Sequence, residues 1–246
     1  MIIANYGNNC SGKTTFSAAL ATKLVDDKNS SCIIIDFNID TPARAVWEPT
    51  NKVSRMFSLG ALLEEEKIDL KVIPKYLLTH KDYNNIGLLG YCSGDTPISY
   101  EEPLYDKMID VIRASEQMVD FVIVDCSSPL LTDTLEAAIE MSDCLNMLIT
   151  PDVKGIVYYQ TAQELFSKSP KFNIEKTNYI LSPVKKWSDS STIQKSLNNN
   201  FFELPYSIDI DFAMNEGEIF NTYKKAPKQY KKVVDSIIKS FKEERR

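Results

Sequence analysis

The segment Gly7–Thr15, GNNCSGKTT, constrains the fold of this chain more than any other stretch of its sequence. It fits the phosphate-loop pattern of a glycine, four residues of any type, and then Gly-Lys-Ser/Thr. The apolar run Ile2–Tyr6 precedes it and a helical pattern over Thr14–Asp27 follows it, which is the strand–loop–helix context that the pattern requires. The sequence therefore predicts a loop that holds the phosphates of a nucleotide.

Each residue type in this loop has a physical task. Gly7 and Gly12 permit a tight turn that points successive backbone N–H groups inward as an anion-binding nest. The positive end of the helix that begins near Lys13 adds to the attraction for phosphate. We expect Lys13 to neutralise the outer phosphates, Thr14 to offer a hydroxyl to Mg²⁺, and Thr15 to donate to an inner phosphate. The predicted nucleotide-binding residues are Gly7, Asn8, Asn9, Cys10, Ser11, Gly12, Lys13, Thr14 and Thr15.

Two aspartates follow apolar runs elsewhere in the chain. The segments CIIIDF and FVIVDC place Asp36 and Asp125 directly after stretches that are typical of buried strands. The carboxyl ends of parallel strands form the crevice in which a ligand lies. Carboxylates at that edge can bind Mg²⁺ directly or through water. We therefore expect Thr14, Asp36 and Asp125 to form a magnesium site beside the phosphate loop.

Short apolar runs alternate with longer helical patterns, which predicts a doubly wound α/β fold, with helices on both faces of a mostly parallel sheet. The expected strands are Ile2–Tyr6, Cys32–Phe37, Ile86–Gly90, Phe121–Asp125, Cys144–Thr150 and Asn178–Leu181. The expected helices are Thr14–Asp27, Leu104–Met118, Thr132–Met141, Val157–Phe166, Thr192–Leu197 and Pro227–Lys242, with two shorter ones between Thr41 and Asn85. No Gly/Ser-rich linker or internal repeat divides the sequence, so we expect residues 1–246 to form one phosphate-loop ATPase domain.

Composition excludes several other classes of protein. The formal net charge of −6 argues against wholesale nucleic-acid binding. The five cysteines are scattered without a C-x-x-C pair, which favours thiols in a reducing compartment over a disulfide scaffold. No run approaches the roughly 20 apolar residues of a membrane span, and no basic segment precedes the first apolar run. The single histidine, His80, is expected at the surface, so a histidine triad or zinc site is not expected. These features predict a cytoplasmic protein.

The C-terminal segment allows two interpretations. Its region from Lys224 to Arg246 contains nine basic and three acidic residues. Over about 227–243 an apolar stripe recurs at helical spacing, so a basic amphipathic helix is expected there. This helix either packs its stripe on the domain and exposes lysines, or uses the basic surface for weak contact with DNA or a membrane.

Taken together, these segments resemble the ParA/MinD family of phosphate-loop ATPases, over nearly the whole chain. The stretches that carry the resemblance are GNNCSGKTT at the family's deviant Walker A loop, IIIDFNIDTP at its first switch, DFVIVDCSSP at Walker B and its second switch, SDCLNMLITPD at the following strand and loop, and LPYSIDIDFAMNEGEIF at its late proline-containing strand and the glycine segment after it. Within the family, the pilus- and secretion-associated TadZ/CpaE-like branch is the most similar. The resemblance implies an ATP- or ADP-binding, Mg²⁺-dependent switch that forms a nucleotide-sandwich homodimer and positions or recruits a partner assembly for a pilus, secretion, conjugation or partition.

Two departures from the family bear on catalysis. The family's signature lysine, which reaches the partner subunit's phosphates, falls at Asn8, and its hydrolytic aspartate falls at Asn38. Asn8 brings no charge, and Asn38 can orient water but cannot act on it as a carboxylate. Loss of a cross-subunit cation can cost on the order of 10³-fold in rate. The residues expected at the reaction centre are Lys13, Asp36 and Asn38, with Asp40 as a candidate substitute, and hydrolysis is expected to be weak or absent.

Two alternatives to the switch remain open from the sequence. The asparagines at positions 8 and 38 also suit a pseudo-ATPase that binds nucleotide permanently and acts as a scaffold. A small-molecule ligase or synthase on the same loop architecture is the other alternative, similar to dethiobiotin synthetase or a cobyrinate-type synthase. That enzyme would need a substrate pocket beyond the phosphate loop.

Overall fold

The computed structural model describes residues 1–26, 29–47, 55–100, 105–168, 176–197 and 199–243. Over these residues, eight strands form one sheet in the order β3-β4-β2-β5-β1-β6-β7-β8. The strands are β1 Ile2–Gly7, β2 Cys32–Asp36, β3 Leu78–Thr79, β4 Ile86–Gly90, β5 Phe121–Asp125, β6 Cys144–Ile149, β7 Thr177–Val184 and β8 Phe202–Pro205. Neighbouring strands run parallel except for the short edge strand β3, which runs antiparallel to β4. The predicted class, a mostly parallel sheet, is confirmed.

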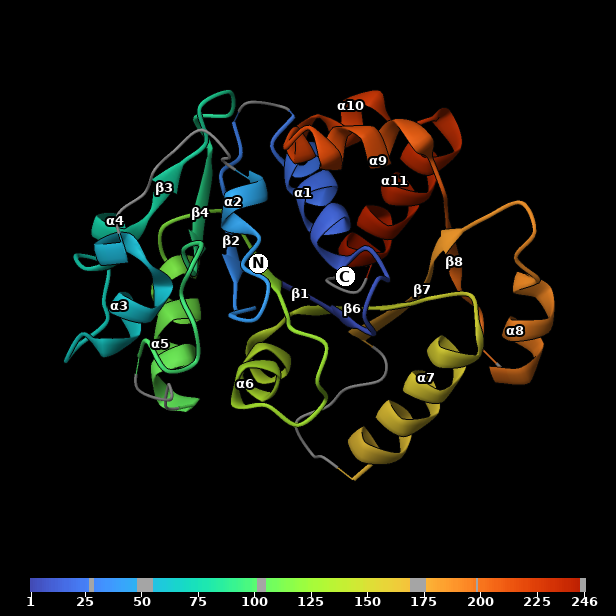
Figure 1. Cartoon of the computed structure of the whole chain (residues 1–246), viewed down its shortest axis with the longest axis horizontal. Coiled ribbons are helices and arrows are strands. Elements are labelled where there is room, and N and C mark those ends of the chain that lie inside the picture. The colour runs from blue at the N-terminus through green and yellow to red at the C-terminus, as the bar shows by residue number, and fades with distance from the viewer. Residues whose placement is uncertain (27–28, 48–54, 101–104, 169–175, 198, 244–246) are drawn as a thin grey trace.

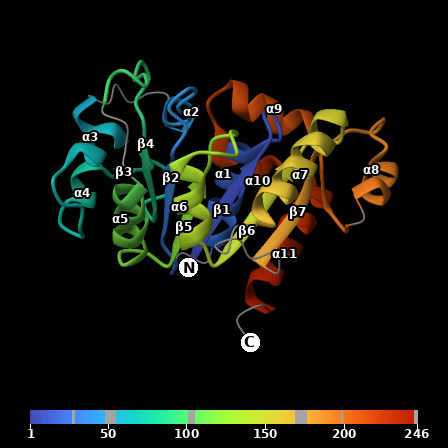
Figure 2. The same ribbon diagram turned by 90° about the horizontal axis from the view of Figure 1, so that it is seen from below.

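Helices cover both faces of this sheet (Figure 1). One layer contains α3 Leu59–Glu64, α4 Ile73–Tyr76, α5 Tyr105–Glu116, α6 Asp133–Met141, α7 Val153–Phe166 and α8 Ser190–Leu197. The other contains α1 Lys13–Leu24, α2 Arg44–Trp47, α9 Ile208–Asn215, α10 Thr222–Lys225 and α11 Lys228–Glu243. Short 3₁₀ turns occur at Arg55–Phe57 and Ile219–Asn221. The view from below shows the sheet between the two layers (Figure 2).

Alternating side chains of each strand enter different cores. In β1, Ile2, Ala4 and Tyr6 belong to the core under α3–α8, whereas Ile3 belongs to the core under α1 and α11. Successive side chains of a strand point to opposite faces, and both faces of this sheet are covered. The strands therefore need apolar residues at nearly every position, which explains their continuous apolar runs.

The structure differs from the sequence prediction at several places. The short strand β3 and the short helix α9 were not predicted, and β8 was expected only from the resemblance, as the family's late proline-containing strand. The alternation in IDIDF of α9 is typical of a strand rather than a helix. Helix α7 begins at Val153 instead of Val157, because the Asp152 carboxylate caps it by accepting from Gly155 N at 2.9 Å. The predicted ends at Asp27 and Leu104 and the final residues 244–246 lie outside the described part of the chain.

The expectation of a surface histidine is wrong. His80 is 5% exposed, and its ring packs on Phe220 with the ring centroids 4.4 Å apart. Its Nδ1 accepts a hydrogen bond from Asp82 N at 3.1 Å. The ring is therefore part of the packing between the β3–β4 region and the segment before α10.

Helix α11 packs its apolar stripe onto the core that also contains α1. Its buried stripe residues are Tyr230, Val234, Ile237 and Phe241. Of the two interpretations of this segment, the packed helix describes the structure, and contact of its lysines with DNA or a membrane stays a prediction. In the ranges that the structure describes, no helix is both long and apolar enough to cross a bilayer.

Candidate functional site

The site lies where β1, β2 and β5 end. Strands β2 and β5 pair in parallel with Asp36 and Asp125 as register partners, and both side chains are buried. Burial raises the pKa of Asp125 to about 6, while hydrogen bonds from the Thr14 and Ser17 hydroxyls act in the opposite direction. Burial and then the charge of Asp125 raise the pKa of Asp36 above its usual value. The edge of the sheet thus brings together two carboxylates that repel each other when both are ionised.

The two carboxylates differ in their hydrogen bonds. Asp36 accepts from Asn38 N at 2.9 Å through Oδ1 and from Ala43 N at 2.7 Å through Oδ2, so it holds the loop that follows β2. Asp125 Oδ1 is buried and has no hydrogen-bond partner among the residues that the structure describes. A buried carboxylate oxygen without a partner is costly unless a cation or a donor compensates it.

The unpartnered Oδ1 atom of Asp125 shows whether the residues of this site fit Mg²⁺. In the described ranges, no cluster of three or more His, Cys, Asp or Glu residues could hold a metal by itself. Mg²⁺ commonly takes one or two carboxylates and completes its octahedron with phosphate oxygens and water. Asp125, with the Thr14 hydroxyl next to it, is a donor set of that kind. The residues present fit Mg²⁺ delivered together with a nucleotide.

The phosphate loop has the backbone conformation that an anion nest needs. Gly7 and Gly12 have φ values of 154° and 82°, and Cys10 has φ 62°, which is uncommon for a residue other than glycine. A Cβ on Gly7 would lie 1.8 Å from Leu148 O, so no other residue fits between the loop and β6. Helix α1 begins at Lys13, directly after the loop. The first N–H groups of α1 and those of the loop therefore share one anion-binding concavity.

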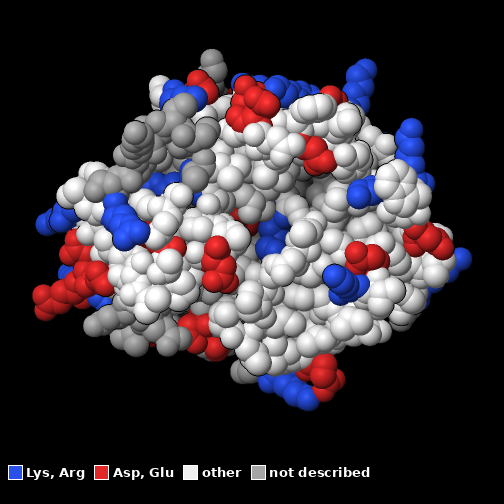
Figure 3. All heavy atoms as spheres, viewed as in Figure 1, with Lys and Arg blue, Asp and Glu red and all other residues white. Residues whose placement is uncertain are grey.

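The amine of Lys13 lies over the start of the loop. Its Nζ donates to Gly7 O at 3.0 Å, to Asn8 O at 3.1 Å and to Ser128 Oγ at 2.8 Å. Burial lowers the pKa of Lys13, and the charge of Asp125 raises it. In the space-filling view, basic and acidic atoms meet in a depression near the centre of this face (Figure 3). The cation therefore bridges the loop and the segment after β5, where it can meet a phosphate held by the nest.

Both asparagines that depart from the family pattern make hydrogen bonds within their own chain. Asn8 donates from Nδ2 to Thr150 Oγ1 at 2.8 Å and accepts from Thr150 N at 3.0 Å. Asn38 donates from Nδ2 to Thr41 Oγ1 at 2.8 Å and accepts from Thr41 N at 3.3 Å. Asn8 thus ties the phosphate loop to the loop after β6, and Asn38 stabilises the turn after β2.

A cavity lies on the other side of the phosphate loop, and the part of its lining that α9 and the segment before it supply was not predicted from the sequence. It has a volume of about 340 Å³ and is lined by Cys10, Gly12, Thr15, Ser182, Pro183, Tyr206, Ser207, Asp211 and Met214, among others. Thr15 and Met214 both line this cavity, and Thr15 Oγ1 donates to Met214 Sδ at 3.3 Å. The cavity adjoins the phosphate nest, so it has the position and polar lining for a nucleoside. Helix α9 supplies several of its residues, and the strand-like alternation of that segment concealed them.

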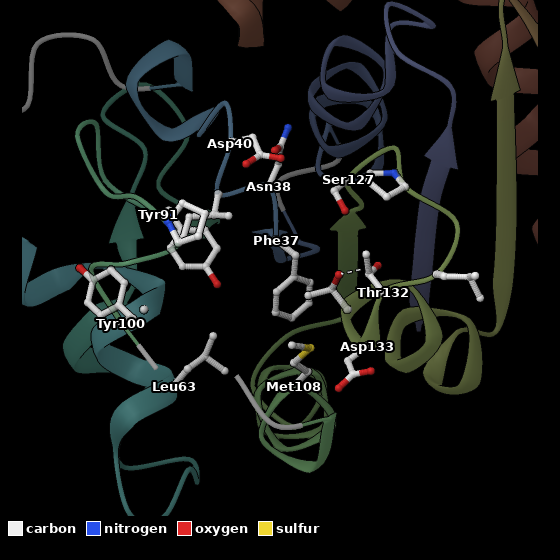
Figure 4. A pocket seen from close by; sticks show the side chains of 16 residues that line it. Phe37, Asn38, Asp40, Leu63, Tyr91, Tyr100, Met108, Ser127, Thr132 and Asp133 are labelled. Atoms are coloured by element: carbon white, nitrogen blue, oxygen red, sulfur yellow. Dashed lines mark hydrogen bonds between the residues drawn. The ribbon is translucent and has the colours of Figure 1, made fainter. Parts of the chain in front are cut away.

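A larger cavity of about 540 Å³ separates the segment after β2 from the segment after β5. Figure 4 shows Asn38, Asp40 and Ser127 at one end of it, and Phe37, Leu63, Tyr91, Tyr100 and Met108 around its apolar part. Asp40 is exposed at this rim.

No protein-family model matches this sequence, and no curated protein matches it either. Among solved structures, a ParA family ATPase from Chlorobium tepidum aligns with a TM-score of 0.81 at 14% identity, over 96% of this chain and 98% of that one. The septum site-determining protein MinD from Pyrococcus horikoshii, complexed with Mg-ADP, aligns with a TM-score of 0.72 at 16% identity, over 96% of each chain. An ATP complex of McdA from Cyanothece aligns with a TM-score of 0.73 at 15% identity, over 98% of this chain and 96% of that one. The chain therefore has the fold of ParA/MinD family ATPases, as the resemblance in its sequence predicted.

Proposed function

We propose that this chain is an ATP-binding switch of the ParA/MinD kind that acts in the cytoplasm. In its nucleotide-bound form it recruits or positions a partner assembly, such as that of a pilus, a secretion or conjugation system, or a partition apparatus. One observation carries the proposal: the Lys13 amine lies over the phosphate nest, near the charge of Asp125, whose Oδ1 atom is orphaned. That arrangement suits a triphosphate with its Mg²⁺, and the solved MinD and McdA structures contain Mg-ADP and ATP respectively.

Each predicted residue has a role in this proposal. The loop residues Gly7–Gly12 offer backbone N–H groups to the phosphates, Lys13 neutralises the outer phosphates and Thr15 lies at the nucleoside side. Thr14 and Asp125 would hold Mg²⁺, which would supply positive charge to offset the negative charge of the phosphates. Asp36 acts on this site from the neighbouring strand, by holding the loop after β2.

Hydrolysis is slow in this proposal because the chain lacks a carboxylate at position 38. Asn38 cannot accept a proton from water, and its amide is occupied by Thr41. Asn8 brings no cation to a second subunit, since its amide is uncharged, and that amide is bonded to Thr150 of its own chain. Asp40 at the cavity rim is the carboxylate that remains near the segment after β2.

The proposed dimer uses the face that contains the phosphate loop. Large apolar side chains are exposed around it: Leu131 is 81% exposed, Val153 73% and Val157 53%. Val153 and Val157 line an open hollow together with Asn9 and Cys10 of the loop. A second copy of the chain, placed face to face, would cover these side chains and enclose two nucleotides.

A scaffold that binds nucleotide without turnover is the second candidate function, and the internal hydrogen bonds of Asn8 and Asn38 favour it. Two measurements distinguish the candidates on purified protein: the oligomeric state with ADP and with ATP, and the release of phosphate. A switch is expected to dimerise with ATP only and to hydrolyse it slowly, with a gain in turnover for Asn38→Asp. A scaffold would show no turnover for the wild type and the same oligomeric state with both nucleotides. Failure to bind either nucleotide would overturn both candidates.

A further inference from the structure

Five polar residues form one row across the centre of the sheet. Register partners connect Asp36 to Asp125, Asp125 to Asn5, Asn5 to Asn146 and Asn146 to Asn178, on five consecutive strands. Partnered residues of parallel strands point to the same face. The apolar neighbours two positions away in these strands belong to the core under α1 and α11. The row therefore runs beneath those two helices, with two carboxylates at one end and three asparagines beside them.

The asparagines are joined into a continuous chain of hydrogen bonds. Asn178 Nδ2 donates to Asn146 Oδ1 at 3.2 Å, and Asn146 Nδ2 donates to Asn5 Oδ1 at 2.8 Å. Asn5 Nδ2 in turn donates to Ser17 Oγ on α1 at 2.9 Å. The Ser17 hydroxyl also lies beside the carboxyl of Asp125, whose pKa it lowers. We call this chain, Ser17–Asn5–Asn146–Asn178, the asparagine ladder.

The far end of the ladder, Asn178, contacts the C-terminal helix α11. Ser240 Oγ of α11 is placed to donate its single proton either to Asn178 Oδ1 at 3.1 Å or to Ile237 O of its own helix at 2.6 Å. The ladder therefore extends from the predicted magnesium site, through three strands, to the helix with the basic surface. Its three asparagines are all buried.

Donor and acceptor accounting fixes the direction of the ladder. A carboxylate that binds a metal only accepts hydrogen bonds, so Ser17 has to donate to it and accept from Asn5. Asn5 then has to accept from Asn146, and the same logic continues to Ser240. All donors thus point toward Asp125, and hydrogen bonds aligned in this way strengthen one another in a low-dielectric core.

Stability alone does not account for this row. Replacing bonded polar partners by apolar groups of the same shape can be neutral or stabilising, and the core around the row is otherwise apolar. A half-satisfied network is worse than an apolar core, so one missing amide affects all the others. The ladder instead leads to one functional group, the carboxylate of Asp125, whose oxygen atoms a metal would use.

We propose that the asparagine ladder positions the carboxylate of Asp125 for Mg²⁺ and links that site to the seating of helix α11. The residues Ser17, Asn5, Asn146 and Asn178 are positioning residues, since they act through Asp125 and touch no nucleotide. This inference rests on the proposed function, because it assumes that the chain binds a nucleotide with Mg²⁺. Occupancy of the site fixes the ladder with its donors toward Asp125, which favours the Ser240 bond that attaches α11.

The test measures the dissociation constant of ADP with and without Mg²⁺, and takes the ratio of the two. Asn146→Leu removes the middle rung, and Ser240→Ala removes only the last donor, on a half-buried position that does not threaten the fold. Ser236→Ala is the matched control, since its hydroxyl lies on the same helix, is exposed, and donates to Lys232 O outside the ladder. Far-ultraviolet circular dichroism establishes that each variant is folded.

We expect the tightening by Mg²⁺ to fall about tenfold in Asn146→Leu and about threefold in Ser240→Ala, by the usual worth of a buried hydrogen bond. Ser236→Ala is expected to match the wild type. In a Ser17→Ala background, adding Asn146→Leu is expected to give no further loss, because Ser17→Ala already disconnects the ladder from Asp125. An unchanged ratio in Ser240→Ala and Asn146→Leu would overturn the inference alone. A wild type that does not bind ADP, or that binds it equally well without Mg²⁺, would instead overturn the proposed function.

Discussion

Asp36 and Asp125 are register partners on neighbouring parallel strands. Both carboxylate oxygens of Asp36 accept hydrogen bonds from backbone N–H groups of its own loop, whereas Asp125 has one buried oxygen that accepts none in the described part of the chain. Asp36 therefore organises a loop, whereas Asp125 has an oxygen atom that we propose binds a cation.

The first prediction concerns the pH dependence of stability. Burial raises the pKa of Asp125 to about 6 from an ordinary value of 3.8. A carboxyl whose pKa is raised in the folded state stabilises the fold while it is protonated. This contribution to the unfolding free energy is complete below about pH 3.8 and is lost as the pH rises through about 6. Between pH 5 and 7.5 the nucleotide-free wild type should lose about 1–2 kcal/mol of unfolding free energy relative to Asp125→Asn. Urea unfolding of both proteins measures this, and parallel pH profiles would contradict it.

The second prediction concerns Gly7. Its Cβ position lies 1.8 Å from Leu148 O, so Gly7→Ala forces the loop away from β6. We expect loss of nucleotide binding and a destabilisation of more than about 3 kcal/mol. Gly12→Ala is the control, because its Cβ would meet only Ser182 Oγ at 3.4 Å and its φ of 82° costs about 1–2 kcal/mol. Equal melting temperatures for the two variants would show that the close contact with β6 is not what holds the loop.

The third prediction concerns the bond between Asn8 and Thr150. Thr150→Val removes the hydroxyl that accepts from Asn8 Nδ2 while it keeps the side-chain volume. A phosphate loop that is less firmly tied should bind ADP about three- to tenfold more weakly. Thr161→Val provides the control, since Thr161 lines the same hollow and its hydroxyl donates to Val157 O. Isothermal titration that finds both variants equal to the wild type would refute a role for this bond.

The fourth prediction concerns helix α11. Ile237 is fully buried in the core with α1, so Ile237→Ala should cost about 2–4 kcal/mol of unfolding free energy. Lys239→Ala, on an exposed position of the same helix, should change it by less than about 0.5 kcal/mol. If α11 detaches easily to contact a membrane, the two variants would unfold at the same denaturant concentration.

Much of the fold and part of the site could be predicted from local patterns. The phosphate loop has a fixed spacing, and Asp36 and Asp125 each interrupt an apolar run at the end of a strand. Asn5 and Asn146 are likewise polar residues within apolar runs and Asn178 begins one, but the sequence did not predict that they form a group. Asparagine there has no chemistry of its own that suggests a site, and only the register of β1, β6 and β7 shows that the three are neighbours.

Other features depended on contacts that no local pattern contains. The exposure of His80 was mispredicted because the residue that covers it, Phe220, is 140 positions away in the sequence. The internal bonds of Asn8 and Asn38 depend on Thr150 and on the turn at Thr41. Helix α9 concealed the residues of the nucleoside-side cavity, because a short helix with alternating polarity cannot be told from a strand by its period.

The central claim is that Lys13 and the phosphate loop hold the phosphates of a nucleotide with Mg²⁺. The most direct measurement is the dissociation constant of Mg·ATP for the wild type, for Lys13→Ala and for Lys23→Ala, the other lysine of α1, which forms ion pairs with Asp26 and Asp235. We expect that Lys13→Ala binds at least about tenfold more weakly, whereas Lys23→Ala binds as the wild type does. Equal affinities for Lys13→Ala and the wild type, or no binding by the wild type, would contradict the claim.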